Sequence, residues 1–240
     1  AIESVISQDY PCIEYIVIDG GSTDGTIKII DEYRKHISVI ISEPDEGIYD
    51  ALNKGIAKAN GNFIGILHSD DLFCDKSVIS DVISKLNSTN SELCFSDLVL
   101  VDKESGELKR YYMAHYFRRW MLRIGWLPPH PTVFIKRSLF DEFGFYSKNY
   151  KIAGDFEFFV RIFYGRKINW VYLNRISVMM REGGASNSGI SSIILAISEI
   201  NRSLNSNHVW SNPIFQIARY FIRLIEIISK PKNKSYNPLK

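Results

Sequence analysis

Two adjacent aspartates, Asp70 and Asp71, directly follow an apolar run at residues 62–69. The run is short, mostly apolar and preceded by Gly61, which predicts a buried central strand. Ligands of open α/β sheets bind beyond the carboxyl ends of such strands. Two carboxylates placed there repel each other unless a cation joins them, and a hard divalent ion that also binds diphosphate oxygens meets that need. The alternative is that an aspartate caps the helix expected over residues 75–86.

A third aspartate, Asp155, follows Gly154 at the expected start of a short helix over residues 154–164. A carboxylate placed there can point into a cleft and accept the proton of a hydroxyl group. If the helix is rotated, Glu157 takes this role instead. The alternative is again helix capping, which is common for aspartate.

A polar loop with a glycine pair follows the strand expected over residues 13–18. Its first residue, Asp19, has a carboxylate that can accept hydrogen bonds from a nucleotide base or a ribose. The glycines allow the backbone to approach a ligand closely. The loop has neither the GxGxxG pattern nor the lysine of a P-loop. Asp24, in the same loop, is expected to cap the next helix.

Strands and helices alternate along the first part of the chain. Helical spacing over residues 26–36 and 48–60 separates three expected strands, over 13–18, 38–42 and 62–69. This βαβαβ order predicts a parallel, doubly wound sheet. The later elements are expected as strands over 92–102, 132–135, 168–173 and 176–180, and as helices over 111–126, 137–143, 154–164 and from 188 onward.

The composition is that of a globular protein. The 240 residues are 45% hydrophobic and carry a formal net charge of +2, so a sizeable core is expected. Lys and Arg gather at residues 108–140 and 201–240, but no nucleic-acid-binding signature accompanies them. Three cysteines without metal or disulfide spacing favour a reduced, cytoplasmic setting. We expect no signal peptide, and no apolar run of the sequence is long enough to span a bilayer.

Four motifs occur in a fixed order at the expected strand and helix ends: DGGSTDGT at 19–26, EPDEGIYDALNKG at 43–55, SDD at 69–71 and AGDFEF at 153–158. Together they resemble family 2 glycosyltransferases, over about residues 1–187. The resemblance implies an α/β fold of the GT-A type, with a Rossmann-like, mostly parallel sheet flanked by helices, followed here by a helical C-terminal extension. It also implies transfer of a sugar from a nucleotide-sugar donor with inversion, most often from a UDP-sugar.

The resemblance implies roles for individual residues on the donor side. Asp19 would contact the nucleotide base, and Asp45 would line the same pocket. Asp70 would face the ribose or the metal, and Asp71 would bind Mn²⁺ or Mg²⁺. Many family members carry an arginine before the asparagine of the second motif. This chain has leucine there, so Lys54 is expected to supply the cation instead.

The acceptor side is expected around Asp155 as the catalytic base, with Glu157 as its neighbour. His130 lies between two prolines and is expected near the acceptor or the diphosphate, although a lone histidine is more often structural. Arg181 begins a glycine-containing segment, residues 181–186, that could close over the donor. The alternative is a plain surface loop.

The chain divides into three parts under this interpretation. Residues 1–101 form the nucleotide-sugar-binding half, 102–187 the acceptor and catalytic half, and 188–240 a basic, helical extension. Residues 2–8 have the pattern of the end of an amphipathic helix. Because a strand normally precedes that helix in such a domain, we expect the first strand to be missing. Gly20 replaces a second acid found in many family members.

Polar residues recur every three or four positions over residues 213–230 on an otherwise apolar helix. Such a helix can lie in a membrane interface, and the basic, aromatic segment 111–126 fits the same surface. The expected partner is a glycan or polyprenyl-diphosphate-linked acceptor at the inner face of the cytoplasmic membrane. Alternatively, the helix docks on the protein's own core or on a second copy in a homodimer.

The sequence therefore predicts a metal-dependent inverting glycosyltransferase of the hexosyltransferase type in surface polysaccharide biosynthesis, such as O-antigen, capsule or exopolysaccharide. One alternative is a nucleotidyltransferase, which also uses a Rossmann-like sheet with metal-binding acids. Another is a truncated, non-catalytic remnant that binds nucleotide. The sugar, the acceptor and the linkage depend on pocket shape and do not follow from the fold.

Overall fold

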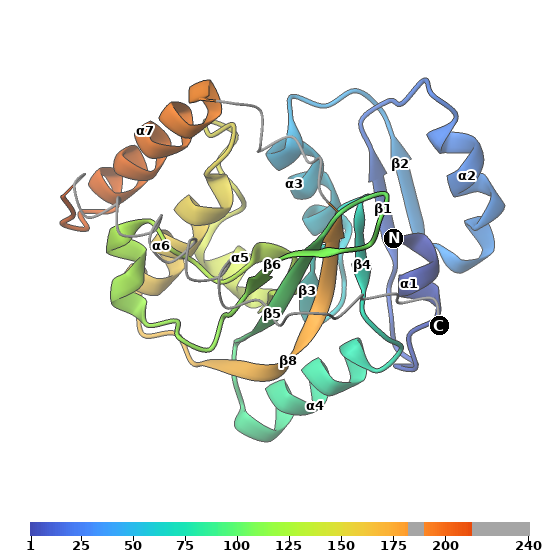
Figure 1. The fold of residues 1–240 in the computed structure, drawn as a ribbon, viewed down its shortest axis with the longest axis horizontal. Coiled ribbons are helices and arrows are strands. Elements are labelled where there is room, and N and C mark those ends of the chain that lie inside the picture. The colour runs from blue at the N-terminus through green and yellow to red at the C-terminus, as the bar shows by residue number, and fades with distance from the viewer. Residues whose placement is uncertain (182–189, 213–240) are drawn as a thin grey trace.

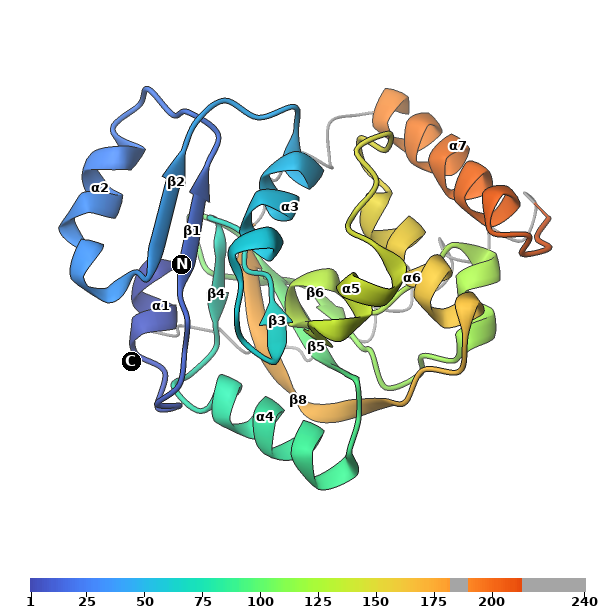
Figure 2. The same ribbon diagram turned by 180° about the vertical axis from the view of Figure 1, so that it is seen from behind.

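Two β-sheets form the centre of the computed structural model, which describes residues 1–181 and 190–212. In chain order the elements are α1 (Ile2–Ile6), β1 (Ile16–Asp19), α2 (Thr26–Glu32), η1 (Arg34–His36), β2 (Val39–Ser42), α3 (Ile48–Lys58), β3 (Phe63–Gly65), β4 (Asp71–Phe73), α4 (Val78–Thr89), β5 (Leu93–Val101), β6 (Leu108–Tyr112), η2 (Arg119–Ile124), η3 (His130–Thr132), β7 (Phe134–Lys136), α5 (Ser138–Phe143), α6 (Gly154–Gly165), β8 (Trp170–Arg181) and α7 (Ile190–Ser206). Figures 1 and 2 show β1, β2 and α2 at one end of the molecule and α6 and α7 at the opposite end.

The smaller sheet consists of β1 and β2, which pair in parallel as predicted. Ile16 lies opposite Val39, and Asp19 lies opposite Ser42 at the carboxyl ends of both strands. Helix α3 packs closely on β1 at Gly55, where a Cβ atom would lie 3.2 Å from the Ile18 side chain. The parallel pairing of the two strands places the loops after β1 and β2 at the same edge of the sheet.

The predicted α/β fold class is confirmed, but the larger sheet is mixed rather than mostly parallel. Its strand order is β3-β7-β5-β8-β4, with β6 paired to the other part of β5. Within this sheet only β5 and β8 run parallel. The physical reason lies in the connections, because β5 turns directly into β6 through a tight loop in which Gly106 has φ +68°. A short loop of this kind joins antiparallel neighbours, whereas parallel partners need a long crossover such as the one containing α6.

Strand β5 and helix α6 carry the main hydrophobic core. All residues of β5 except Leu100 are buried, and α6 buries Phe156, Phe158 and Phe159 against it. Aromatic rings connect the two elements, since Phe117 makes an edge contact with both Phe95 and Phe163. This core fixes the start of α6, where Asp155 lies.

Three expected elements differ in the structure. The helix expected over 111–126 is instead the end of β6 followed by the 3₁₀ helix η2, which ends at Gly125 in a left-handed conformation (φ 75°). The two strands expected over 168–180 are one strand, β8, whose pairing with β5 is irregular near Asp97. The strand expected over 62–69 is confined to β3, since residues 66–70 lead away to the cavity described below.

Helix α7 confirms a helical segment after residue 188 and lies against α6 (Figures 1 and 2). No helix within residues 1–181 and 190–212 is long and apolar enough to cross a membrane. The amphipathic helix expected over 213–230 and most of the expected loop 181–186 lie outside the described residues.

Candidate active site

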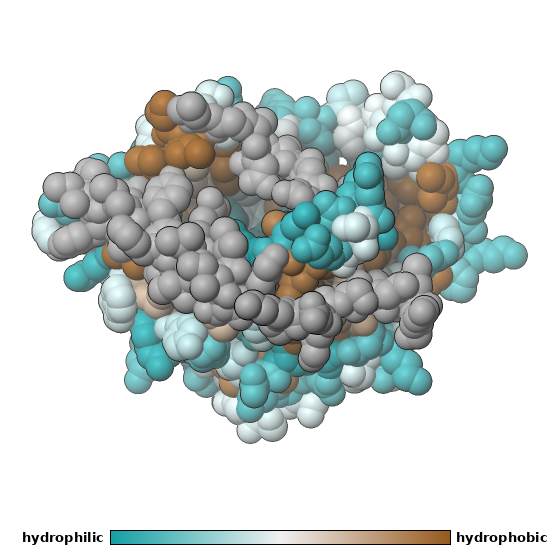
Figure 3. Space-filling view, in the orientation of Figure 1, coloured by the Kyte–Doolittle hydropathy of each residue, from teal (hydrophilic) through white to brown (hydrophobic). Residues whose placement is uncertain are grey.

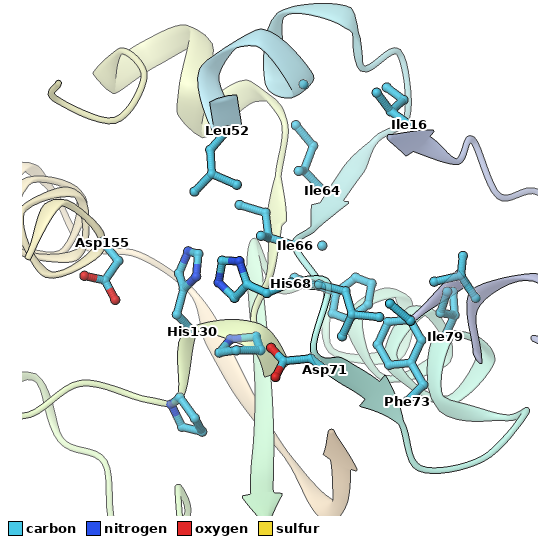
Figure 4. Close-up of a pocket in the computed structure, with 18 of the residues that line it drawn as sticks. Ile16, Leu52, Ile64, Ile66, His68, Asp71, Phe73, Ile79, His130 and Asp155 are labelled. Carbon is cyan, nitrogen blue, oxygen red and sulfur yellow. The ribbon is translucent and has the colours of Figure 1, made fainter. Parts of the chain in front are cut away.

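A cavity of about 1470 Å³ extends between the strands β1, β3 and β4 and the helices α3 and α6. One end is polar, and Figure 4 shows His68, His130, Asp71 and Asp155 grouped there. The cavity brings together a set of the residues predicted from the sequence: Asp70, Asp71, His130, Asp155 and Arg181. These residues come from separate parts of the chain, and the fold brings them to one cavity.

Asp155 lies in the first turn of α6 and is half-buried. Its Oδ1 atom accepts a hydrogen bond from the backbone N–H of Phe156 at 2.7 Å and lies 3.4 Å from the Tyr49 hydroxyl group. Burial raises the pKa of Asp155 to about 6 although these hydrogen bonds oppose the shift. A carboxylate with this pKa is ionised near neutral pH and is still basic enough to accept a proton.

Tyr49 holds the start of α6 from the side of α3. Its hydroxyl group donates to the carbonyl of Ile152 at 2.7 Å, and its ring lies against Gly154. A Cβ atom at Gly154 would lie 2.7 Å from the ring, so only glycine permits this contact. The close packing of Tyr49 and Gly154 fixes the direction in which Asp155 points.

Glu199 of α7 holds the same region from the other side and was not predicted from the sequence. Its carboxylate accepts hydrogen bonds from three successive backbone N–H groups, those of Lys151, Ile152 and Ala153, at 2.8, 2.9 and 2.9 Å. The residue is only 4% exposed. Its sequence signal is an acid next to apolar Ile200 on the face of α7 that packs on the core. Glu199 therefore positions the backbone immediately before Asp155.

Asp71 is the first residue of β4, where it pairs with Met180 of β8. It is 1% exposed, and neither carboxylate oxygen has a hydrogen-bond partner within the described residues. Burial raises the pKa of Asp71 to about 7, and the neighbouring Asp70 adds to the shift. A buried carboxylate without a partner is costly to ionise and calls for a cation.

The carboxylates suit a divalent ion that is completed by phosphate oxygens. Within the part of the chain that the structure describes, no group of three or more His, Cys, Asp or Glu side chains forms a metal cluster. Magnesium is commonly bound by only one or two carboxylates together with substrate phosphates, so a closed protein cage is not required. The unpaired oxygens of Asp71, with half-buried Asp70 beside it, fit this arrangement.

Two histidines lie beside the carboxylates. The rings of His68 and His130 have centroids 6.2 Å apart, and His130 Nε2 lies 2.9 Å from the Tyr146 hydroxyl group. Burial lowers the pKa of His130 to about 3, and burial also lowers the pKa of His68. Both rings are therefore neutral at physiological pH, so His130 faces the predicted site but brings no positive charge to a diphosphate.

Three basic side chains line the same cavity: Lys103, Arg110 and Arg181. Arg181 was predicted, whereas Lys103 and Arg110 come from the β5–β6 hairpin and were missed. The guanidinium group of Arg110 lies 4.4 Å from the centroid of the Tyr112 ring. The local signal was weak, because a Lys and an Arg around a turn are ordinary surface residues unless the hairpin is known to fold over a cavity.

Asp19 is 7% exposed and already accepts several hydrogen bonds within its own loop region. Its donors are the backbone N–H groups of Gly21 and Ser22 and the hydroxyl groups of Ser22 and Ser42. Burial alone would raise the pKa of Asp19, but these hydrogen bonds outweigh it and the pKa is lowered. Asp19 therefore shapes the loop, and it does not line the cavity that contains Asp155.

Asp45 lies beside the same loop. A Cβ atom at Gly20 would be 2.5 Å from Asp45 Oδ2, so the absence of a side chain at Gly20 makes room for this carboxylate. Lys54 donates to the Pro44 carbonyl at 2.9 Å and forms an ion pair with Glu43 at 2.8 Å. Neither Asp45 nor Lys54 lines the large cavity, and Lys54 is engaged with the 43–47 loop.

The structure gives Glu157 a different role from the predicted one. Glu157 is 7% exposed and forms a two-point ion pair with Arg161 at 3.0 and 2.9 Å. Arg161 in turn donates to the backbone carbonyls of Phe143, Gly144 and Phe145. Glu157 does not line the cavity, because its position in α6 directs it toward this loop.

The parallel β1–β2 layer, the carboxylate pair at the start of β4 and the aspartate in the first turn of α6 together indicate an α/β fold of the GT-A type. The model of the family "Glycosyl transferase family 2" matches residues 1–153, which is more than half of the chain. The chain belongs to glycosyl transferase family 2.

Known proteins agree with this assignment. An uncharacterised glycosyltransferase of Mycobacterium tuberculosis is 34% identical over 166 residues, which cover 67% of this chain and 61% of that protein. A PGL/p-HBAD biosynthesis glycosyltransferase of Mycobacterium bovis is 26% identical over 192 residues, covering 78% of this chain and 73% of that protein. The crystal structure of S. aureus TarS 1-349 in complex with UDP-GlcNAc has a TM-score of 0.66 at 17% identity, over 93% of this chain and 67% of that one.

The chain thus spans about three fifths of the length of the M. tuberculosis relative. The similarity to TarS is too distant in sequence to show more than the fold.

Proposed function

We propose that the chain transfers a sugar from a nucleotide-sugar, in particular a UDP-sugar, to a hydroxyl group of an acceptor, with inversion and with the help of Mn²⁺ or Mg²⁺. The observation that carries the proposal is a single cavity lined by Asp155, by the Asp70–Asp71 pair and by the basic residues Lys103, Arg110 and Arg181. A nucleotide-sugar offers a chemical counterpart to each group. Its reacting sugar carbon suits Asp155, its metal-binding diphosphate suits the Asp70–Asp71 pair, and its negative charge suits the basic residues. The UDP-GlcNAc complex of TarS, which shares the fold, supports the choice of donor.

Asp155 acts as the base in the proposed reaction. The acceptor oxygen forms a bond to the anomeric carbon while the bond from that carbon to the diphosphate breaks. The acceptor proton passes to Asp155, and the nucleoside diphosphate leaves with the electron pair. Asp70 and Asp71 would hold the divalent ion, which acts as a Lewis acid toward the diphosphate when bound. The basic side chains of the cavity stabilise the negative charge that develops on the leaving group.

The loops after β1 and β2 complete the donor site in this proposal. The carboxylate of Asp19 fixes the first loop by its hydrogen bonds, and Asp45 fits against Gly20 next to it. Lys54 fixes the second loop through the Pro44 carbonyl. We place the nucleotide base and the ribose along these loops, because they follow the carboxyl ends of two parallel strands.

The acceptor in this proposal is a glycan or a polyprenyl-diphosphate-linked sugar of surface polysaccharide biosynthesis, used at the inner face of the cytoplasmic membrane. A surface of aromatic and basic residues around η2 supports membrane contact: Tyr116, Trp120, Arg118, Arg119 and Arg123 are all exposed. Aromatic rings and Lys or Arg side chains together favour a membrane interface with anionic headgroups. The relative named as a PGL/p-HBAD biosynthesis glycosyltransferase supports a biosynthetic role of this kind.

Calorimetric titration of UDP, GDP and dTDP, with and without Mn²⁺, tests the donor class. We expect UDP to bind at least tenfold more tightly with Mn²⁺ than without, because the Asp70–Asp71 pair repels the diphosphate unless a cation lies between them. Incubation with UDP-sugars should then release UDP. Release of sugar 1-phosphate would indicate nucleotidyl transfer instead, and the absence of binding by any nucleotide would contradict the proposal.

Replacing Glu199 with glutamine tests how the base is positioned. The carboxylate of Glu199 accepts hydrogen bonds from three backbone N–H groups, whereas the NH₂ group of glutamine cannot accept one. We therefore expect kcat to fall about tenfold while the KM for the nucleotide-sugar stays the same. The negative charge of Glu199 contributes to the raised pKa of Asp155. The acid limb of the pH profile should therefore shift to lower pH in this variant. Asp141→Asn, at an exposed site on α5, is the control, and an unchanged pH profile in Glu199→Gln would argue for a purely structural role.

A further inference from the structure

Two histidines face the middle of the cavity, and the proposed reaction gives neither of them a role. In Figure 4 the rings of His68 and His130 lie between Asp155 and Asp71. The Nε2 atom of His130 is paired with the Tyr146 hydroxyl group. Among the described residues, neither nitrogen of His68 nor Nδ1 of His130 has a hydrogen-bond partner, and none of these atoms is shut off from the cavity. The free ring nitrogens are therefore available to a ligand that lies between the carboxylates.

The neighbouring tyrosine determines which nitrogen of His130 carries the ring proton. Tyr146 is 2% exposed, and its hydroxyl group has no hydrogen-bond partner within the described residues other than Nε2, at 2.9 Å. The hydroxyl proton is therefore used only if Tyr146 donates it to Nε2. In a neutral histidine the ring proton is then on Nδ1. His130 thus offers an N–H donor, rather than a lone pair, to the cavity.

The contact between Tyr146 and His130 is held in place from both sides. Asn53 of α3 donates to the Tyr146 carbonyl at 2.8 Å and accepts from the Tyr146 N–H at 3.0 Å. The Tyr146 ring packs against Phe158, with ring centroids 5.0 Å apart. His130 begins η3, in which the Thr132 hydroxyl group donates to a backbone carbonyl of β5 at 2.9 Å. A polar group whose supporting residues are fixed in this way is suited to recognising one ligand geometry.

The distance between the two rings fits one hydroxyl group between them. The ring centroids of His68 and His130 are 6.2 Å apart. A direct N–H···N bond between two imidazole rings needs centroids about 5 Å apart, so the rings do not bond each other. A hydroxyl oxygen about 2.9 Å from one nitrogen of each ring spans the observed distance with an angle close to tetrahedral at the oxygen. Such a hydroxyl group accepts from one ring and donates to the other, which a phosphate oxygen cannot do.

The location of the pair indicates which part of the donor reaches it. In the proposed reaction the diphosphate lies at the Asp70–Asp71 pair and the acceptor oxygen at Asp155, with the transferred sugar between them. The β5–β6 hairpin brings Lys103 and Arg110 to the cavity, and in Figure 3 a hydrophilic ridge lies where Figure 1 draws the turn of this hairpin. These cations suit the charged diphosphate. The uncharged histidine rings suit the hydroxyl groups of the sugar.

We propose that His68 and His130 together recognise one hydroxyl group of the transferred sugar and so select donors in which that hydroxyl group is present and unsubstituted. This inference rests on the proposed function, because it takes the donor to be a nucleotide-sugar. The Nδ1–H of His130 donates to the sugar hydroxyl group, which donates in turn to His68. A deoxy sugar leaves ring nitrogens of both histidines without a partner after water has been displaced, and it is rejected for that reason.

Calorimetry in the presence of Mn²⁺ tests this selectivity without an acceptor. The probes are UDP, UDP-glucose, UDP-galactose and UDP-N-acetylglucosamine, together with the monodeoxy analogues of each sugar. For the sugar that binds most tightly, we expect removal of one hydroxyl group to weaken binding at least tenfold. Equal binding of all analogues, or sugars that bind no more tightly than UDP, would overturn the proposal.

His68→Phe keeps a ring and removes both of its nitrogens. We expect the tenfold penalty for the missing hydroxyl group to fall below about threefold in this variant, while UDP binds as it does to the wild type. His36→Phe is the matched control, because His36 is an exposed residue of η1 that does not line the cavity. An unchanged penalty in His68→Phe, or weaker binding of UDP by that variant, would overturn the proposal. If the wild type binds no nucleotide at all, the proposed function itself fails.

Tyr146→Phe tests the donor role of His130. The variant keeps the ring that packs on Phe158 and removes the hydroxyl group that fixes the tautomer. In spectra of the protein labelled with ¹⁵N-histidine at pH 8, we expect His130 to be protonated on Nδ1 in the wild type and to show both tautomers in the variant. The penalty for the missing hydroxyl group should fall about threefold. A wild-type His130 protonated on Nε2 would overturn the role assigned to it.

Discussion

Asparagine in place of Asp155 is expected to reduce sugar transfer about a thousandfold, while the protein still binds UDP and Mn²⁺. General acid–base catalysis by a positioned side chain contributes about 10²–10⁴-fold, and an amide cannot accept the acceptor proton. Asparagine keeps the Oδ1 atom that accepts the hydrogen bond from Phe156, so the start of α6 is retained. Calorimetry and initial rates of transfer on the same preparation separate the two effects.

The pH dependence of the wild-type enzyme gives a second view of the same residue. Burial raises the pKa of Asp155 to about 6. The rate should therefore fall about tenfold per unit as the pH drops below 6, because the protonated carboxyl group cannot act as a base. In the asparagine variant the remaining activity should not show this fall in rate below pH 6.

Glu157→Gln on the same helix is the matched control. It weakens the ion pair with Arg161 and so lowers the stability of the protein, but it leaves the cavity lining unchanged. We expect transfer per folded molecule to stay within about threefold of wild type, since Glu157 does not face the cavity. Retained transfer by Asp155→Asn, or a loss of transfer confined to Glu157→Gln, would assign the base to Glu157 instead.

The fold class could be predicted from the sequence because the patterns that indicate it are local. The alternation of β1, α2, β2 and α3 follows from apolar periodicity, and the motifs at residues 19–26 and 43–55 lie between a strand end and a helix start. The motif at 69–71 instead leads into β4, because the preceding strand ends at Gly65. The order of strands in the larger sheet is a matter of long-range pairing, which no local pattern encodes. The segment at 111–126 has many aromatic and basic residues. Leu122 is buried in the core by the 3₁₀ helix η2 rather than by a regular helix, and Phe117 is buried in the irregular segment just before it.

The candidate site could be predicted only in part for the same reason. Asp70, Asp71 and Asp155 each lie where an element begins or ends, so their convergence followed from the topology. Glu199 lies far from the motifs in sequence and acts through the backbone of residues 151–153, so its neighbour Ile200 indicates burial but not the contact with the segment before Asp155. The pairing of Glu157 with Arg161 was also hidden, because an acid and a base four residues apart on a helix are usually surface residues.

Replacing Asp71 with asparagine is expected to change both stability and metal binding, in opposite directions. Burial raises the pKa of Asp71 from 3.8 to about 7, so the folded state holds the proton more tightly than the unfolded chain. The stability contributed by the protonated carboxyl group is complete below about pH 4 and is lost as the pH rises to 7. The loss is at most about 4 kcal/mol, from roughly 1.4 kcal/mol for each pKa unit.

The asparagine variant cannot ionise, so it escapes this loss and should be the more stable protein at pH 8. At pH 5 the difference between the two proteins should be much smaller, because the wild-type carboxyl group is largely protonated there. Urea unfolding midpoints at both pH values measure the effect. Asp31→Asn, an exposed residue on α2, is the control and should show no such dependence.

Metal and nucleotide should reverse the order of stability. Mn²⁺ with UDP binds the ionised carboxylate of the folded protein only, so it is expected to restore the stability of the wild type at pH 8 through linkage. The asparagine variant should gain much less from the same addition, because its amide is a poor ligand for a hard divalent cation. A variant that binds UDP in the presence of Mn²⁺ as tightly as the wild type would show that Asp71 is not the metal ligand. If the urea unfolding midpoints of the two proteins depended on pH in the same way, the Asp71 carboxylate would have a partner in the folded protein.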